Sequence, residues 1–217
     1  MLSRKPEGNE CELSKSETSS KITARNITVG SSISSMKEAL LLIDIQNDYF
    51  PGGKMELIGM EEAAKNASEL LKAFRNADKP VFFIKHLSTR SDATFLIPET
   101  GGIDIHSSVS PLADEIIIEK HFPNSFLQTE LLSVLKESDI TDLVICGAMS
   151  HMCIDTTVRA AKELGFKCTL IADACATRNL KFGSEILPAQ TVHAVFMAAL
   201  DGMFATVVTA DRYQSPV

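Results

Sequence analysis

Short, continuous apolar runs alternate with segments of helical periodicity from residue 36 to the end of the sequence. The six apolar runs predict buried strands, and they cover residues 39–45, 80–86, 115–120, 142–147, 166–174 and 205–211. Segments with apolar residues three and four positions apart predict helices, over residues 61–76, 127–138, 153–165 and 188–204. This alternation is typical of a mostly parallel sheet with helices on both faces. We therefore expect an α/β fold of three α/β/α layers, with a doubly wound, Rossmann-like sheet of six strands.

Two segments depart from this alternation. Residues 1–35 are rich in serine, carry mixed charge and have no sustained apolar pattern, so they predict a flexible N-terminal extension. This segment lacks the apolar stretch of a secretory signal and contains acidic residues that a mitochondrial transit peptide avoids. Residues 87–112 predict a long loop, and a loop of that length inside a compact domain usually serves function. We expect residues 36–217 to form a single domain.

Composition and charge narrow the class of protein. The 217 residues are 45% hydrophobic and 23% charged, as in an ordinary globular protein, and the formal net charge is −7. An acidic surface repels phosphate backbones, so we expect no nucleic-acid partner. No apolar run reaches the roughly 18 residues that span a bilayer, so we expect no membrane partner.

The five cysteines form an odd set without a C-x-x-C pair: Cys11, Cys146, Cys153, Cys168 and Cys175. Neither a disulfide framework nor a zinc ribbon fits this pattern, which favours a reducing compartment and a cytoplasmic location. We expect Cys146 and Cys168 within strands, Cys175 in a loop and Cys11 in the extension.

Three reactive side chains fall at the predicted strand ends. Asp44 ends the first strand, Lys120 ends the third, and Cys153 opens the helix after the fourth. Because ligands bind beyond the carboxyl ends of the strands in open parallel sheets, we expect these side chains to meet at one edge. A helix start and a nearby cation lower the pKa of a thiol, and Asp44 can take the thiol proton and return it to a leaving group. The pattern predicts acyl transfer by Cys153, with backbone N–H groups of the preceding loop as the oxyanion hole.

The residues alone leave simpler interpretations open. A free cysteine at a helix start is often a packed apolar residue, while Asp44 can be a loop cap and Lys120 a surface cation. Motifs of dinucleotide, P-loop and serine-hydrolase sites are absent, and a metal site is a minor alternative with His86 as its first candidate. A receiver-like signalling domain would need an acceptor aspartate where Lys120 stands.

Four segments resemble the isochorismatase-like cysteine hydrolase superfamily, which includes nicotinamidases and N-carbamoylsarcosine amidases. They are LLLIDIQNDYFPGG, IHSSVSPLADEIIIEKHFPNSFLQTELLSVL, VICGAMSHMCIDTTVRAA and LIADACAT, and they span roughly residues 37–210. The resemblance implies that residues 36–217 are an isochorismatase-like hydrolase domain with a catalytic triad of Asp44, Lys120 and Cys153.

The resemblance also describes the pocket. It implies a cis peptide bond between Ala148 and Met149, and an oxyanion hole made by the N–H groups of Met149 and Cys153. Tyr49 falls where the family often has an aromatic residue lining the pocket, and we also expect His121 to bind the substrate.

The expected reaction follows from one departure and one retained residue. Metal-dependent nicotinamidases carry an Asp-x-His pair where this chain reads GGKMELIGMEE, so we expect no metal or other cofactor. Retention of Cys153 favours hydrolysis of an amide, ureido or related C–N bond of a small molecule through a thioester, with Asp44 as general acid and base and Lys120 as electrostatic partner. The alternatives are vinyl-ether hydrolysis of the isochorismatase type and a non-catalytic member acting as a protein-interaction scaffold. The apolar segment VHAVFMAALDGMF also favours a homo-oligomer.

Overall fold

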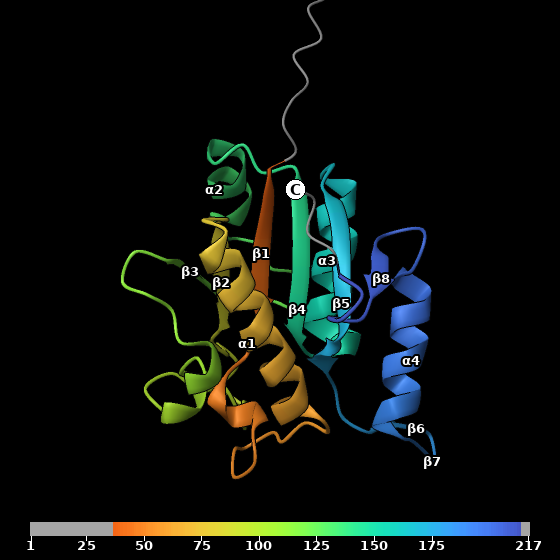
Figure 1. Cartoon of the computed structure of the whole chain (residues 1–217). Coiled ribbons are helices and arrows are strands. Elements are labelled where there is room, and N and C mark those ends of the chain that lie inside the picture. Colours follow the sequence, from red (N-terminus) through yellow and green to blue (C-terminus); the bar gives the residue numbers. More distant parts are fainter. Residues whose placement is uncertain (1–36, 214–217) are drawn as a thin grey trace, which may run out of the picture. The chain divides into compact units, whose positions relative to one another are not determined.

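The computed structural model describes residues 37–213, and a six-stranded sheet forms their centre. Its strands are β1 (Glu38–Ile43), β2 (Val81–His86), β3 (Ile116–Lys120), β4 (Asp142–Ala148), β5 (Lys167–Ala176) and β8 (Thr206–Val208). The order across the sheet is β3-β2-β1-β4-β5-β8, and every neighbouring pair is parallel (Figure 1). The predicted doubly wound sheet is confirmed. The predicted N-terminal extension, residues 1–35, lies outside the described residues.

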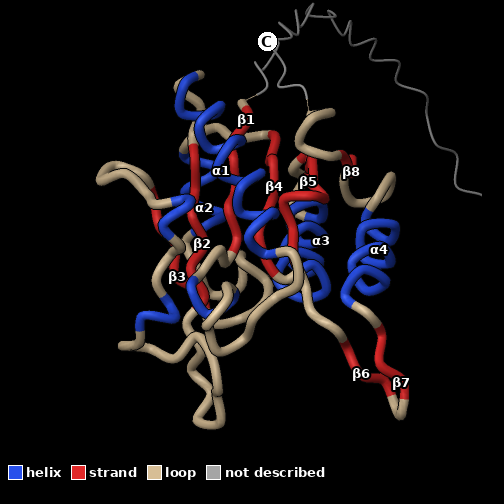
Figure 2. Tube along the Cα trace, turned by 60° about the horizontal axis from the view of Figure 1, so that its bottom comes forward, coloured by secondary structure: helices blue, strands red, loops and turns tan. Residues whose placement is uncertain are grey.

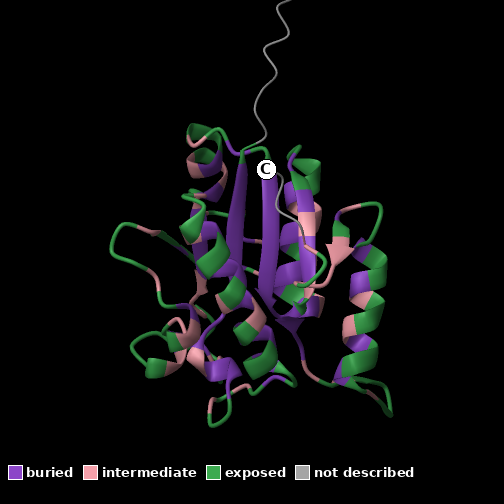
Figure 3. Cartoon of the chain, viewed as in Figure 1, coloured by how far each residue is buried: buried purple, intermediate pink, exposed green. Residues whose placement is uncertain are grey.

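Helices cover both faces of this sheet. They are α1 (Met60–Asn76), α2 (Leu131–Glu137), α3 (Asp155–Glu163) and α4 (Ala189–Leu200). Helix α1 packs on one face, where its Leu71 shares a buried cluster with Leu40 of β1. The other three helices cover the opposite face, and their Leu135, Val158 and Leu200 belong to a second buried cluster. Strands β1 and β4 are buried along their whole length, and the exposed residues of the helices face outward (Figure 3).

The structure corrects several predicted boundaries. Helix α2 begins at Leu131 and not at residue 127, because turns occupy the residues before it. Cys175 lies in β5 and not in a loop, because the register between β4 and β5 shifts by extra residues in β5, after which Gly147 pairs with Cys175 and the strand continues. Strand β8 covers only part of the predicted run, and α4 ends at Leu200, before the predicted residue 204.

A hairpin between β5 and α4 was missed. Strands β6 (Leu180–Phe182) and β7 (Glu185–Leu187) pair antiparallel around a turn in which Gly183 has a φ of 59°. The hairpin stands away from the sheet (Figure 2). Phe182 at its tip is 79% exposed, and Val195 on the outer side of α4 is 59% exposed. These apolar surfaces fit a homo-oligomer, which stays a prediction. Among the described helices, none is long and apolar enough to cross a membrane.

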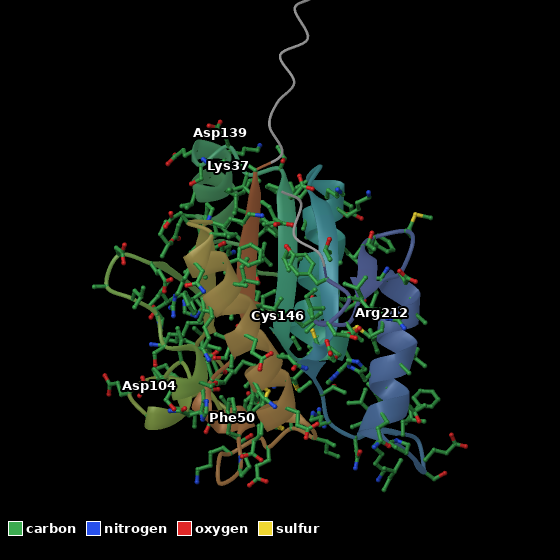
Figure 4. The ribbon with its side chains drawn as sticks, viewed as in Figure 1. Lys37, Phe50, Asp104, Asp139, Cys146 and Arg212 are labelled. Atoms are coloured by element: carbon green, nitrogen blue, oxygen red, sulfur yellow. The ribbon has the colours of Figure 1, made fainter. Side chains whose placement is uncertain are left out.

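The loops that follow the carboxyl ends of the strands gather at one end of the sheet. In Figure 4, Phe50 and Asp104 mark this end, whereas Lys37 and Asp139 lie at the other. The strand order reverses between β1 and β4, which is where open α/β sheets bind ligands. Gly147 of β4 has a φ of 126° at this point, and a Cβ atom there would overlap the Ile43 carbonyl oxygen. Only glycine lets the two strands approach each other so closely.

Candidate active site

Asp44, Lys120 and Cys153 meet at this end of the sheet. Asp44 directly follows β1, Lys120 is the last residue of β3, and Cys153 lies in the π-helical turn η4 (Ser150–Ile154) after β4. The Nζ atom of Lys120 lies 2.8 Å from Oδ2 of Asp44 and 3.2 Å from Sγ of Cys153. Asp44 and Lys120 are fully buried, and Cys153 is 4% exposed. The residues selected by their positions at strand ends thus form one buried cluster.

The backbone of Asp44 makes the turn out of the sheet. Its φ is 52°, in the left-handed region, which aspartate tolerates better than most residues. Its N–H group donates to the carbonyl of Ile84 at 3.0 Å, so the residue remains tied to β2 as the chain leaves β1. The position of the carboxylate is therefore fixed by the sheet itself.

Lys120 has two further contacts, which no motif indicated. Its Nζ lies 2.8 Å from Nδ1 of His86 and donates to the Phe122 carbonyl at 3.2 Å. His86 and Lys120 are register partners at the ends of β2 and β3, so the sheet places them side by side. The surrounding acceptors offset the cost of burying an ammonium group, which would be several kcal/mol if it were unpaired.

Gln46 also belongs to the surroundings of the site, although the sequence did not predict it there. Its Nε2 donates to the carbonyls of His86 at 2.9 Å and Ile103 at 2.8 Å, and its Oε1 accepts from the His86 N–H at 2.8 Å. Gln46 thereby joins the end of β2 to the long loop that follows it. A signal was available in IDIQND, where polar residues directly follow a buried strand.

Burial dominates the protonation of the cluster. It raises the pKa of the Cys153 thiol to about 12, with a further rise from Asp44 and a smaller opposing effect from Lys120. Lys120 lowers this pKa as expected, but desolvation outweighs its effect, so the expected net decrease is wrong for the resting site. The expected helix start at the thiol is also wrong, because α3 begins only at Asp155. Burial also opposes the charge of Lys120, but Asp44 and Cys153 raise its pKa above the ordinary value. The site holds a neutral thiol beside an ion pair.

The Asp44 carboxylate retains unused acceptor capacity. Neither of its oxygens accepts a well-aligned hydrogen bond from the described residues, although Oδ2 lies 2.8 Å from Nζ of Lys120. The contact is therefore an ion pair without an aligned hydrogen bond. One Asp44 oxygen, Sγ of Cys153 and a ring nitrogen of His86 all lie within 4.8 Å of one another. A buried carboxylate with free lone pairs beside a thiol is suited to general-base chemistry.

The same three atoms are a candidate metal-binding set. Carboxylate, imidazole and thiolate are ligands that Zn²⁺ accepts. However, the Lys120 ammonium contacts all three residues, so an ion held by them would lie directly against another cation. The three candidate ligand atoms are instead arranged around the Lys120 ammonium group.

The loop before the thiol is held by its own backbone and by one buried serine. The peptide bond between Ala148 and Met149 is cis. The Met149 carbonyl accepts from the N–H groups of Met152 at 2.9 Å and Ile154 at 3.3 Å. The Ser150 hydroxyl donates to the carbonyl of Ala176 at 3.2 Å and lies 2.8 Å from Nδ1 of His193.

A cavity of about 360 Å³ opens onto the thiol. Its wall includes Cys153, Met149, His86 and both residues expected to bind substrate, Tyr49 and His121. The long loop predicted from the sequence forms much of the remaining wall, through Ser88, Arg90, Asp92, Ala93, Thr94, Phe95 and Leu96.

Asp48 anchors this loop to the site. Its carboxylate is buried, and Oδ2 accepts from the N–H of Leu96 at 2.6 Å while Oδ1 accepts from the N–H of Lys54 at 3.2 Å. Gly102 packs so closely on the Asp48 side chain that a Cβ atom would overlap it. The part of the cavity wall that the long loop forms is therefore positioned by Asp48, which lies only four residues after Asp44.

The family model of the isochorismatase domain matches residues 38–212, which is most of the chain. The chain belongs to the isochorismatase family. YddQ of Bacillus subtilis (strain 168), an uncharacterized member of this family, is 52% identical over 82% of this chain and 99% of its own length. A crystal structure described as a hydrolase of the isochorismatase type, from Oleispira antarctica, is 46% identical with a TM-score of 0.79. That match covers 82% of this chain and 95% of the other.

A more distant member of the family is named for a reaction. Streptothricin hydrolase of Streptomyces noursei is 29% identical over 69% of this chain, which corresponds to 53% of its own length. The chain is therefore placed among hydrolases of the isochorismatase family.

Proposed function

We propose that this chain hydrolyses an amide, ureido or related C–N bond of a small molecule through a thioester formed on Cys153. The observation that carries the proposal is the contact of one ammonium group, Lys120, with both the Asp44 carboxylate and the Cys153 sulfur, directly behind a cavity that Cys153 lines. A nucleophile, a general base and a cation in mutual contact are the groups that acyl transfer requires.

The first half-reaction breaks the C–N bond. Asp44 takes the proton of the Cys153 thiol as sulfur attacks the carbonyl carbon. Because the thiol pKa is raised, this proton leaves only when a substrate is in place. The resulting oxyanion accepts hydrogen bonds from the N–H groups of Met149 and Cys153. Asp44 then gives its proton to the leaving nitrogen, the C–N bond breaks, and an amine and a thioester remain.

The second half-reaction releases the acid. A water molecule gives a proton to Asp44 while its oxygen attacks the thioester carbon. The tetrahedral intermediate expels the Cys153 sulfur, and the proton returns from Asp44 to the thiolate. Lys120 keeps its charge throughout and stabilises the anionic form of each partner in turn. Protons and bonds balance without a cofactor.

The substrate is a small molecule on this proposal. A volume of about 360 Å³ lies near the lower end of the range for ligand pockets, roughly 300–1,000 Å³. Relatives named for C–N hydrolysis support the bond type: nicotinamidase 3 of Arabidopsis thaliana and an N-carbamoylsarcosine amidase of Arthrobacter are both 26% identical.

A vinyl-ether hydrolase is the second candidate. A relative named as a secreted isochorismatase effector, from Verticillium dahliae, is 29% identical over 83% of this chain. Vinyl-ether hydrolysis does not pass through an acyl-enzyme, so it would need Asp44 as an acid but not Cys153 as a nucleophile.

One substrate screen separates the two candidates. Wild type, Cys153→Ala and the control Cys168→Ala are assayed for ammonia release from nicotinamide, N-carbamoylglycine and acetylurea, and for loss of isochorismate. Cys168 is buried in β5, away from the cavity lining, so its substitution tests for a general thiol effect. We expect amide or ureide turnover that disappears only in Cys153→Ala. Isochorismate turnover that survives in Cys153→Ala would favour the second candidate, and amide turnover that survives there overturns the acyl-enzyme.

A further inference from the structure

His86 joins the buried ion pair to the cavity. Its Nδ1 lies 2.8 Å from the Lys120 ammonium, and His86 also forms part of the cavity wall. The backbone of His86 is fixed by Gln46 through both its N–H and its carbonyl. The imidazole therefore contacts the buried Lys120 ammonium and also borders the space that a substrate would occupy.

The contact with Lys120 determines which ring nitrogen carries the proton. An ammonium group has only donors, so the His86 nitrogen that faces it must be an acceptor. A neutral imidazole has one acceptor and one donor, and the proton then lies on Nε2. Burial lowers the pKa of His86 to about 4, so the ring is neutral at physiological pH.

His121 has the opposite arrangement. Its Nδ1 lies 2.9 Å from the carbonyl of Leu87, which can only accept, so this nitrogen carries the proton. The contacts of the two histidines of the cavity wall therefore fix different protons: an Nδ1–H in His121 and an Nε2–H in His86.

We propose that His86 is a substrate-binding residue whose Nε2–H donates to an acceptor oxygen of the substrate, next to the carbonyl carbon that Cys153 attacks. The inference rests on the proposed function and narrows its substrate class. Nδ1 of His86 and Sγ of Cys153 both contact Nζ of Lys120, at 2.8 Å and 3.2 Å, so the imidazole ring lies close to the attacking sulfur, and an atom one or two bonds from the attacked carbon is within reach of the ring. The favoured substrates carry a second carbonyl or carboxylate oxygen there, as acylureas and oxamates do.

Two variants separate this role from a purely structural one. In His86→Asn, the side-chain oxygen can take the place of Nδ1 and keep the contact with Lys120, but nothing replaces the Nε2–H. In His86→Gln, the amide can reach the place of Nε2, but the acceptor for Lys120 is lost. A role that only positions Lys120 would be preserved in His86→Asn, whereas donation to the substrate would be preserved better in His86→Gln.

The experiment compares acetylurea with ethylurea, which differ by one carbonyl oxygen in place of a methylene group. Their dissociation constants are measured by NMR titration in the Cys153→Ala background, so that no turnover is needed. We expect acetylurea to bind about tenfold more tightly, the difference that one hydrogen bond provides, and we expect this preference to vanish in His86→Asn. His86→Gln should keep part of it. Nitrogen-15 spectra of the histidine rings should show protonated Nε2 for His86 and protonated Nδ1 for His121.

Three results would overturn the inference: a protonated Nδ1 on His86, equal binding of the two ureas, or an undiminished preference in His86→Asn. These outcomes are distinct from failure of the proposed function. If Cys153-dependent hydrolysis of another amide is found while the ureas bind equally, only the role of His86 fails. If hydrolysis survives in Cys153→Ala, the acyl-enzyme fails regardless of how the ureas bind.

Discussion

The ammonium of Lys120 lies 2.8 Å from the Asp44 carboxylate, and neither side chain has exposed surface. Two charges buried together are tolerated, but one of them alone is not, because its desolvation is then uncompensated. This asymmetry makes the ion pair testable through stability as well as through activity.

Lys120→Met should abolish activity and lower the free energy of unfolding by about 3–5 kcal/mol, because it leaves Asp44 charged and unpaired. The double variant Asp44→Asn, Lys120→Met should recover most of that stability and none of the activity. Urea denaturation followed by circular dichroism measures both quantities. Equal stability of the single and double variants would contradict the proposed cost of an unpaired charge.

The raised pKa of Cys153 predicts slow chemical labelling. At neutral pH the thiol should react with iodoacetamide more slowly than free glutathione, because only thiolate reacts and burial holds the pKa at about 12. The rate should rise with pH beyond the ordinary thiol value of about 8.5. Mass spectrometry of the peptide that contains Cys153 measures the rate, with Cys153→Ser as the blank. Fast labelling at neutral pH would instead indicate a thiolate in the resting site.

Asp44 and Lys120 could be predicted because each ends a strongly apolar run, and strand ends in a parallel sheet face one ligand site. The roles of His86 and Gln46 could not be predicted in the same way. The contact of His86 with Lys120 depends on the register between β2 and β3, and the bonds of Gln46 depend on where the long loop folds back. The hairpin could have been predicted from the sequence, since Gly183 and Ser184 are a typical two-residue turn between the partly apolar segments LKF and EIL.

Helix α3 was predicted to begin at Cys153, two residues before its start at Asp155, and the reason for the difference is tertiary. Cys153 has good helical neighbours in CIDTTVRAAKELG, which favoured a helix start at the thiol itself. In the structure a π-helical turn begins at Ser150, whose hydroxyl contacts Ala176 and His193. Contacts with segments so distant in sequence leave no local pattern.

His86 should make the protein less stable in mild acid. Burial lowers its folded pKa from 6.5 to about 4, so the unfolded chain binds the proton more readily in that window. Stability is then complete above the unfolded value and is lost as the pH falls toward the folded value, by up to about 3 kcal/mol. Unfolding free energies of wild type and His86→Asn, measured from about pH 7 down to about pH 4.5, should converge as the pH falls. Parallel curves would assign the acid sensitivity to other groups, such as His151 or His193, whose pKa values burial also lowers.

A side chain at Gly147, at the centre of the site, would be destabilising for two separate reasons, backbone strain and steric overlap. The Gly147 φ of 126° disfavours any side chain, and a Cβ atom would in addition overlap the Ile43 carbonyl oxygen where β1 and β4 meet. Gly52 is a matched control, because its φ is also positive, at 85°, but no atom lies within 4 Å of an added Cβ. Gly52→Ala should cost about 1–2 kcal/mol from backbone strain alone.

Gly147→Ala should cost more than Gly52→Ala, by about 1–3 kcal/mol, because overpacking adds to the backbone strain. Its activity should fall further than its stability explains, because any shift of β4 against β1 moves Cys153 relative to Asp44. Thermal unfolding and kcat/KM of both variants provide the comparison. Equal losses in the two variants would mean that β1 and β4 adjust to the added methyl group, and that the spacing between nucleophile and base is set elsewhere.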